Sequence, residues 1–173
     1  MKKTIYLWIA NEGWKPFDYE LQSTKDLLIR KSIKISDKAE IGDEIKIGNE
    51  AEIGDGANIG DKAEIGYGSK IGYKAKIDDG ANIGDKAKIG YEAEIGFGAE
   101  IGCGVEIGDG AKICYGVEID NGSKIGDGAK IGGEAKIGFG ANIGDLAKIG
   151  NKAEICFEAE INDGAKKRNS KFK

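Results

Sequence analysis

The sequence predicts an all-β fold, a single-stranded parallel β-helix with three sides and 18 residues per coil. Three observations lead to this expectation. Isoleucine stands at every sixth position from Ile29 to Ile161. Within each unit a small residue, a polar residue and isoleucine follow one another, which is the alternation of a strand with one buried face. Aromatic residues at the turns recur 18 positions apart, which is three units and therefore one coil of a three-sided helix.

The first 28 residues do not follow the repeat. A strand is expected over residues 4–10 (TIYLWIA), followed by a turn at residues 11–13. A second strand is expected over residues 17–21, where aromatic and apolar residues alternate, and a helical turn over residues 23–28. The segment therefore predicts a short hairpin-like cap on the first coil.

Aromatic side chains crowd this N-terminal segment, and two interpretations remain open. A solenoid needs a cap over its terminal coil to prevent end-to-end pairing, and a hydrophobic segment supplies one. The same residues could instead bind a protein partner or ligand. The candidates are Tyr6, Trp8, Trp14, Phe17 and Tyr19.

The repeat array over residues 29–166 comprises 23 units, or about 7.7 coils. Glycine follows the isoleucine in 16 of the 23 units, and glycine fills the fourth position in 11 of the 23. The fourth position suits a backbone with positive φ, which glycine adopts without strain. For the 12 units with lysine, glutamate, serine or leucine in that position, we expect a different turn type that tolerates side chains.

The turn aromatics form three pairs at 18-residue spacing, and Tyr67 is left without a partner. Stacked rings on neighbouring coils stabilise one another by about 0.5–1.5 kcal/mol per pair. The exposed rings could also form a self-association surface, and both roles remain open. The pairs are Tyr73 with Tyr91, Phe97 with Tyr115, and Phe139 with Phe157.

Two ladders of like charge also recur at this spacing. They could bind cations and a polyanion respectively, or they could serve as turn residues and as solvated strand residues. The acidic ladder is Asp109, Asp127, Asp145 and Asp163, and the basic ladder is Lys112, Lys130, Lys148 and Lys166.

The pattern Ile-Gly-x-x-Ala-x, as in IGDGAN (53–58) and IGDKAK (83–88), resembles the hexapeptide-repeat superfamily. The resemblance covers residues 29–166 and implies a left-handed β-helix and a homotrimer. Many members are acyl- or acetyltransferases that use coenzyme A or acyl carrier protein at sites between subunits. Their catalytic base is typically a histidine, and related carbonic anhydrases hold their metal with three histidines.

The sequence contains no histidine, and no loop interrupts the array. We therefore expect a noncatalytic structural or protein-interaction module that self-associates, most simply as a trimer. No catalytic residue, cofactor or metal site is assigned. The alternative is an acyl- or acetyltransferase that uses coenzyme A with a non-histidine base, such as a carboxylate in a groove between subunits.

Charge and cysteine content narrow the classes of partner and compartment. The net charge is −4, and only the tail, residues 167–173, is strongly basic, so no stripe for nucleic acid is expected. Cys103, Cys114 and Cys156 form no CxxC pair, which disfavours a disulfide framework or a structural zinc site. A reducing, cytoplasmic compartment is expected.

The hydrophobic stretch near the N-terminus is too short for a targeting or membrane segment. Asn11 and Glu12 interrupt it, and no small-residue cleavage site follows. No run of about 20 apolar residues occurs, so no membrane span is expected.

Overall fold

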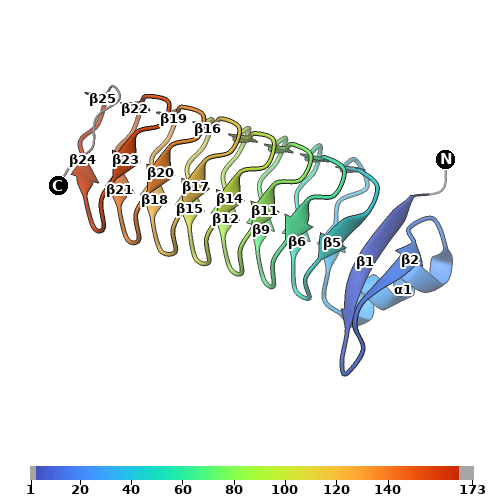
Figure 1. The fold of residues 1–173 in the computed structure, drawn as a ribbon. Helices are drawn as coiled ribbons and strands as arrows, with labels where there is room; N and C mark the ends of the chain where they lie inside the picture. The colour runs from blue at the N-terminus through green and yellow to red at the C-terminus, as the bar shows by residue number, and fades with distance from the viewer. Residues whose placement is uncertain (1–2, 168–173) are drawn as a thin grey trace.

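The computed structural model describes residues 3–167, which form a β-solenoid with a hairpin and a helix at its N-terminal end (Figure 1). Three parallel sheets form the sides, and the chain passes from one to the next in roughly seven turns. The predicted three-sided β-helix is confirmed. The basic tail predicted at 167–173 lies outside the described residues, except for Lys167.

Each side of the solenoid is one sheet. Sheet 1 has the order β2-β1-β5-β8-β11-β14-β17-β20-β23, with bounds β1 (Thr4–Ile9), β2 (Gly13–Asp18), β5 (Ile45–Ile47), β8 (Glu64–Ile65), β11 (Asn82–Ile83), β14 (Glu100–Ile101), β17 (Glu118–Ile119), β20 (Lys136–Ile137) and β23 (Glu154–Ile155). Sheet 2 comprises β4 (Glu40–Ile41), β7 (Asn58–Ile59), β10 (Lys76–Ile77), β13 (Glu94–Ile95), β16 (Lys112–Ile113), β19 (Lys130–Ile131), β22 (Lys148–Ile149) and β25 (Lys166–Lys167). Sheet 3 comprises β3 (Lys34–Ile35), β6 (Glu52–Ile53), β9 (Lys70–Ile71), β12 (Lys88–Ile89), β15 (Glu106–Ile107), β18 (Lys124–Ile125), β21 (Asn142–Ile143) and β24 (Glu160–Ile161).

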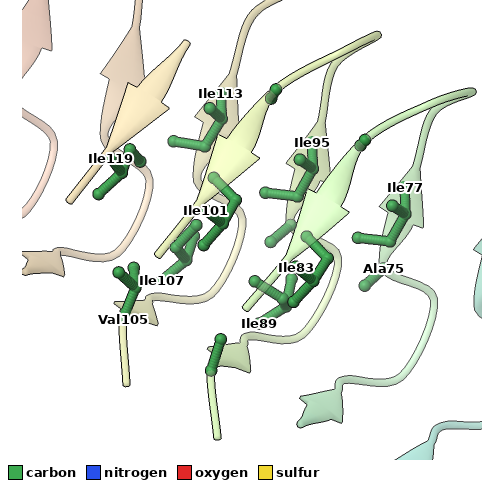
Figure 2. Packing of buried hydrophobic residues seen from close by; sticks show 14 of the residues in the cluster. Ala75, Ile77, Ile83, Ile89, Ile95, Ile101, Val105, Ile107, Ile113 and Ile119 are labelled. Carbon is green, nitrogen blue, oxygen red and sulfur yellow. The ribbon is translucent and has the colours of Figure 1, made fainter. Parts of the chain in front are cut away.

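The register between coils follows the repeat. Ile77 pairs with Ile95 and Ile89 with Ile107, each 18 residues along the chain. Inside the prism, isoleucine and alanine side chains from the three sheets interdigitate (Figure 2). Burying each isoleucine stabilises the fold by about 1.5–3 kcal/mol, so the core is a continuous ladder of small, similar contributions.

The first isoleucine of the period does not join this ladder. Ile29 lies in α1 (Gln22–Arg30) with 74% of its surface exposed, so the expectation that it points inward is wrong. On a helix, successive residues are about 100° apart around the axis. Because Thr24 and Leu28 face the core, Ile29 is turned toward solvent.

The corners share one backbone conformation, whichever residue occupies the fourth position. Lys74 has φ 54° and Glu92 has φ 52°, close to the 65° of Gly80. The expected second turn type is therefore wrong, since 11 of the 12 non-glycine residues in this position have positive φ. The reason is a hydrogen bond between coils: Lys74 N donates to Asp55 O at 3.0 Å, as Gly80 N does to Asp61 O at 2.9 Å.

The glycine that directly follows the isoleucine is required for a different reason. A Cβ placed on Gly90 would lie 2.6 Å from the carbonyl carbon of Gly108 on the next coil. Real Cβ atoms do not approach backbone that closely, so stacking of the coils requires glycine here by steric exclusion and not by φ.

The N-terminal hairpin extends sheet 1. β1 pairs in parallel with β5, with Leu7 opposite Ile47, and β2 pairs antiparallel with β1. β2 begins at Gly13, earlier than the strand expected over residues 17–21, because Trp14 pairs across from Trp8. Within residues 3–167, no helix is long and apolar enough to cross a membrane.

Candidate functional site

The five N-terminal aromatic candidates divide into two groups. Phe17 and Tyr19 pack against the hydrophobic core, and burial raises the pKa of the Tyr19 phenol. Tyr6, Trp8 and Trp14 lie on the outer face, because alternation along β1 turns the neighbouring apolar side chains inward. The structure therefore places two of these residues in the cap and leaves three available to solvent or a partner.

Trp8 and Trp14 are opposite each other on the hairpin, with ring centroids 5.7 Å apart and ring planes at 81°. The β1–β5 pairing brings this pair to the corner that carries Tyr67. The three rings border a cavity of about 200 Å³, which we term the aromatic pocket. Its lining consists of Trp8, Trp14, Gly48, Asn49, Gly66, Tyr67 and Asp85.

Sequence reasoning missed the place of Tyr67 in this pocket. The residue is 40% exposed and Trp8 is 47% exposed, so both retain accessible ring surface. Tyr67 has no aromatic partner at 18-residue spacing, and the rings that line the pocket with it come from the hairpin, outside the repeat register. Only the pairing of β1 with β5 shows that the hairpin rings lie beside this corner.

Polar groups surround the aromatic pocket. Asp85 Oδ1 accepts a hydrogen bond from the backbone N of Tyr67 at 2.8 Å. A hydrogen bond with Glu50 raises the pKa of the Tyr67 phenol above its ordinary value. Lys31 Nζ donates to the carbonyl oxygen of Trp8 at 2.5 Å and lies 3.5 Å from Asn49 Oδ1. The ammonium group of Lys31 is thus already held by protein oxygens.

Two of the three predicted aromatic pairs are stacked. The rings of Tyr73 and Tyr91 lie 5.3 Å apart, and those of Phe139 and Phe157 lie 5.6 Å apart, each pair with planes at 10°. The two pairs lie on different corners of the prism, after sheet 3 and after sheet 1 respectively.

The third pair behaves differently, and no stacking of Phe97 on Tyr115 is found in the described part of the chain. The Tyr115 ring lies over Gly133 on the next coil, 2.7 Å from where a Cβ of that glycine would be. Its hydroxyl lies 3.3 Å from Glu134 Oε1. Because Gly133 leaves this space empty, Tyr115 leans toward the following coil and away from Phe97.

The aspartate ladder is part of the backbone hydrogen bonding. The backbone N of Asp109 donates to Asp127 Oδ1 at 2.8 Å, and that of Asp145 donates to Asp163 Oδ1 at 2.9 Å. Within residues 3–167, no group of three or more Cys, Asp and Glu side chains is arranged to hold a metal ion. On the lysine ladder, Lys112 Nζ pairs with Glu94 at 3.0 Å.

A shallow groove of about 1150 Å³ follows the outer face of sheet 3. Its floor is backbone and glycine, and a row of charged side chains forms one rim. Glu106 lies between Lys88 at 2.8 Å and Lys124 at 3.8 Å, and the Lys88 hydrogen bond lowers the pKa of its carboxyl. The glycines lining it are Gly54, Gly72, Gly90, Gly108, Gly126 and Gly144.

The cysteines offer no assembled reactive centre. Cys103, Cys114 and Cys156 are exposed, and none of them forms a disulfide in the described structure. The backbone N of Cys103 donates to Asn121 Oδ1 at 2.7 Å, the same corner bond that aspartates make elsewhere. Cys103 therefore occupies an ordinary turn position.

Residues 98–133 match one family model, described as bacterial transferase hexapeptide (six repeats). No curated protein matches the chain. Among solved structures, the chain is similar to UDP-N-acetylglucosamine O-acyltransferase (LpxA) from Moraxella catarrhalis RH4, with 20% identity and TM-score 0.63 over 72% of this chain and 63% of that chain. LpxA from Acinetobacter baumannii has 20% identity and TM-score 0.61, over 74% of this chain and 65% of that chain. The acetyltransferase domain of PglB from Neisseria gonorrhoeae FA1090 has 20% identity and TM-score 0.54, over 58% and 51% respectively.

At this level of identity the likeness establishes the fold alone. The fold class is confirmed as a left-handed parallel β-helix, and the resemblance to the hexapeptide-repeat family is confirmed. The chain spans less than two thirds of the length of each of these three structures.

Proposed function

We propose that this hexapeptide-repeat β-helix is a noncatalytic structural or protein-interaction module that self-associates. The observation that supports the proposal is the regularity of the coils. Between β3 and β25 no connection is longer than four residues, so the described solenoid contributes no loop from which a substrate site could be built. A protein that serves as a rigid rod needs only its surface and its ends.

The carboxylates of the groove on sheet 3 also favour a noncatalytic role. A general base works best when its pKa lies near the operating pH. Hydrogen bonds with Lys34 and Lys88 instead lower the pKa of Glu52 and Glu106. Both groups are exposed, and both become weaker bases.

We further propose that the assembly is a homotrimer formed through the corner aromatics. A cyclic trimer uses a heterologous interface, in which two different surfaces of the subunit meet. The three candidate pairs lie on three different corners, so replacing them one pair at a time identifies the two surfaces that meet. Light scattering at micromolar concentration should report a trimer, and a monomer would refute the proposal. Replacing Phe139 and Phe157 by serine tests one corner. Replacing Tyr73 and Tyr91 by serine tests another.

The second candidate function is transfer of acyl or acetyl groups from coenzyme A. It is favoured by the similarity to the PglB acetyltransferase domain, which has also been solved in complex with acetyl coenzyme A. The groove on sheet 3, which follows the solenoid from β3 to β21, is a surface along which such a cofactor could lie.

One assay separates the two functions. Purified chain is incubated with acetyl and longer acyl donors and with amino and hydroxyl acceptors, and released coenzyme A is measured by chromatography. Thiol reagents are avoided because the exposed cysteines would react with them. No turnover above the protein-free control supports the noncatalytic module, whereas robust turnover overturns it. Three exposed cysteines without a disulfide are also the basis on which we propose a reducing, cytoplasmic location.

A further inference from the structure

We propose that the aromatic pocket binds a quaternary or methylated ammonium group. This inference goes beyond the proposed structural role and does not depend on it. The hairpin carries more aromatic side chains than a cap requires. Ile5, Leu7 and Phe17 already cover the first coil from the inner side of the hairpin, whereas Trp8 and Trp14 stand on the outer side.

The ring geometry is that of an aromatic cage. Trp8 and Trp14 are nearly perpendicular, and both line the pocket together with Tyr67 from the corner after sheet 1. The face of an aromatic ring attracts a cation within about 6 Å of its centroid, and tryptophan does so most strongly. Ligand pockets for drug-sized molecules occupy about 300–1,000 Å³. A cavity of about 200 Å³ therefore fits a compact group such as trimethylammonium.

The charges around the cage also favour a cation. Asp85 lines the pocket, and only its Oδ1 is engaged in the bond to Tyr67 N. Glu50 adds a second carboxylate beside the Tyr67 hydroxyl. Lys31 is directed onto Trp8 O and Asn49 Oδ1, and Lys86, which follows Asp85, bonds Tyr67 O through its backbone N and is not among the lining residues. Asp85 is the only charged side chain among the lining residues, so the charge that borders the pocket is negative.

A neutral sugar fits the pocket less well. A sugar ring needs several hydrogen-bond partners for its hydroxyls, and among the lining residues only Asn49 and Asp85 carry polar groups free of an aromatic ring. Gly48 and Gly66 contribute only backbone to the floor. The remaining lining is ring surface, which suits methyl groups on nitrogen.

The chain provides its own reporter, since its two tryptophans are Trp8 and Trp14. Intrinsic tryptophan fluorescence of the full chain is titrated with choline and with 3,3-dimethylbutan-1-ol, which has the same shape without the charge. Choline is expected to change the emission saturably and to bind at least about tenfold more tightly than the alcohol. Equal affinities would overturn the proposal, as would an absence of saturable change up to molar choline. Tighter binding of methyl glucoside than of choline would also overturn it.

Two substitutions with matched controls localise the effect. Asp85→Asn removes the charge but keeps the corner bond, because Asn121 makes the same bond to Cys103 N. We expect it to weaken choline binding about fivefold, whereas Asp109→Asn, which alters the equivalent bond to Tyr91 N, should leave binding unchanged.

Tyr67→Leu removes one wall of the cage and should weaken choline binding by about two- to fivefold. Tyr91→Leu, on another corner, is the control and should have no effect. Circular dichroism of each variant establishes that it is folded. If both members of either pair changed choline affinity alike, the site would not be the aromatic pocket and the proposal would fail.

Discussion

The backbone N of Asp127 donates a hydrogen bond to Oδ1 of Asp145, one coil further along, at 2.8 Å. Asp109, Asp127, Asp145 and Asp163 are linked in this way, each carboxylate receiving the corner amide of the coil before it. The like-charge ladder is therefore tolerated because each acidic group meets the positive end of a peptide dipole. The aspartates function as caps along the corner.

Replacement of Asp145 by alanine should lower stability by about 1–2 kcal/mol, because the amide of Asp127 loses its acceptor. Asp145→Asn should be within about 0.5 kcal/mol of wild type, since Asn151 already accepts the equivalent bond from Gly133 N at 3.0 Å. Denaturant unfolding monitored by circular dichroism measures both. Equal losses for the two variants would show that charge, and not the hydrogen bond, is what matters.

The two glycine positions should respond differently to alanine. Gly90→Ala forces a Cβ to within 2.6 Å of the next coil and should destabilise by about 1–3 kcal/mol through overpacking. The Cβ of Gly110→Ala meets no atom within 4 Å. This variant should lose only about 1 kcal/mol, because alanine must adopt the left-handed φ of 63°. Thermal unfolding of the pair is the measurement, and a larger loss for Gly110→Ala would contradict the steric explanation.

Lys86 has φ 58° at a corner where other coils use glycine. Lys86→Gly should therefore be neutral or stabilising by up to about 1 kcal/mol, because glycine adopts this conformation without strain. The control is Lys130→Gly in β19, where glycine in a strand should cost about 0.5–1 kcal/mol. A destabilised Lys86→Gly variant, measured by the same denaturant titration, would show that the lysine stem contributes more than the strain removes.

Acid should weaken the ion triad on sheet 3, which consists of Lys88, Glu106 and Lys124. Hydrogen bonding to Lys88 lowers the pKa of Glu106 below its ordinary 4.5, so the unfolded chain binds the proton more readily. The stability that the charged Glu106 adds to the folded state is fully present above pH 4.5 and is lost as the pH falls through the folded-state pKa. Glu106→Gln should flatten this part of the stability–pH curve slightly, because the group is solvent-exposed. A curve unchanged between pH 5 and pH 3, measured in low salt, would remove the triad as a contributor.

The architecture could be predicted because its cause is local and repeated. An inward isoleucine such as Ile95 is followed by the same turn and the same strand, so 18 residues later Ile113 must lie directly beside it. The stack of Tyr73 on Tyr91 follows from the same arithmetic. Where a neighbour breaks the pattern the arithmetic fails: Gly133 leaves room into which Tyr115 leans.

The conformation of the corner residues was also beyond sequence reasoning. Glycine in 11 units suggested two turn types, yet Lys74 and Glu92 adopt the left-handed conformation too. A local preference of about 1–2 kcal/mol is overridden at Lys74 and Glu92, because the amide of each donates to a carbonyl oxygen on the previous coil, Asp55 O and Tyr73 O respectively. Strain at single residues is therefore imposed by the stacking of coils.

By itself the sequence determined the solenoid, its 18-residue coil and its isoleucine core, because a period repeated over the whole array admits one register. Only the tertiary structure decided how the unrepeated segment packs against the solenoid. α1 turns Ile29 outward although it is in phase with the period, and the pairing of β1 with β5 brings Trp8 and Trp14 to Tyr67. No repeat relates these residues, so their positions follow from how the hairpin packs on the first coil.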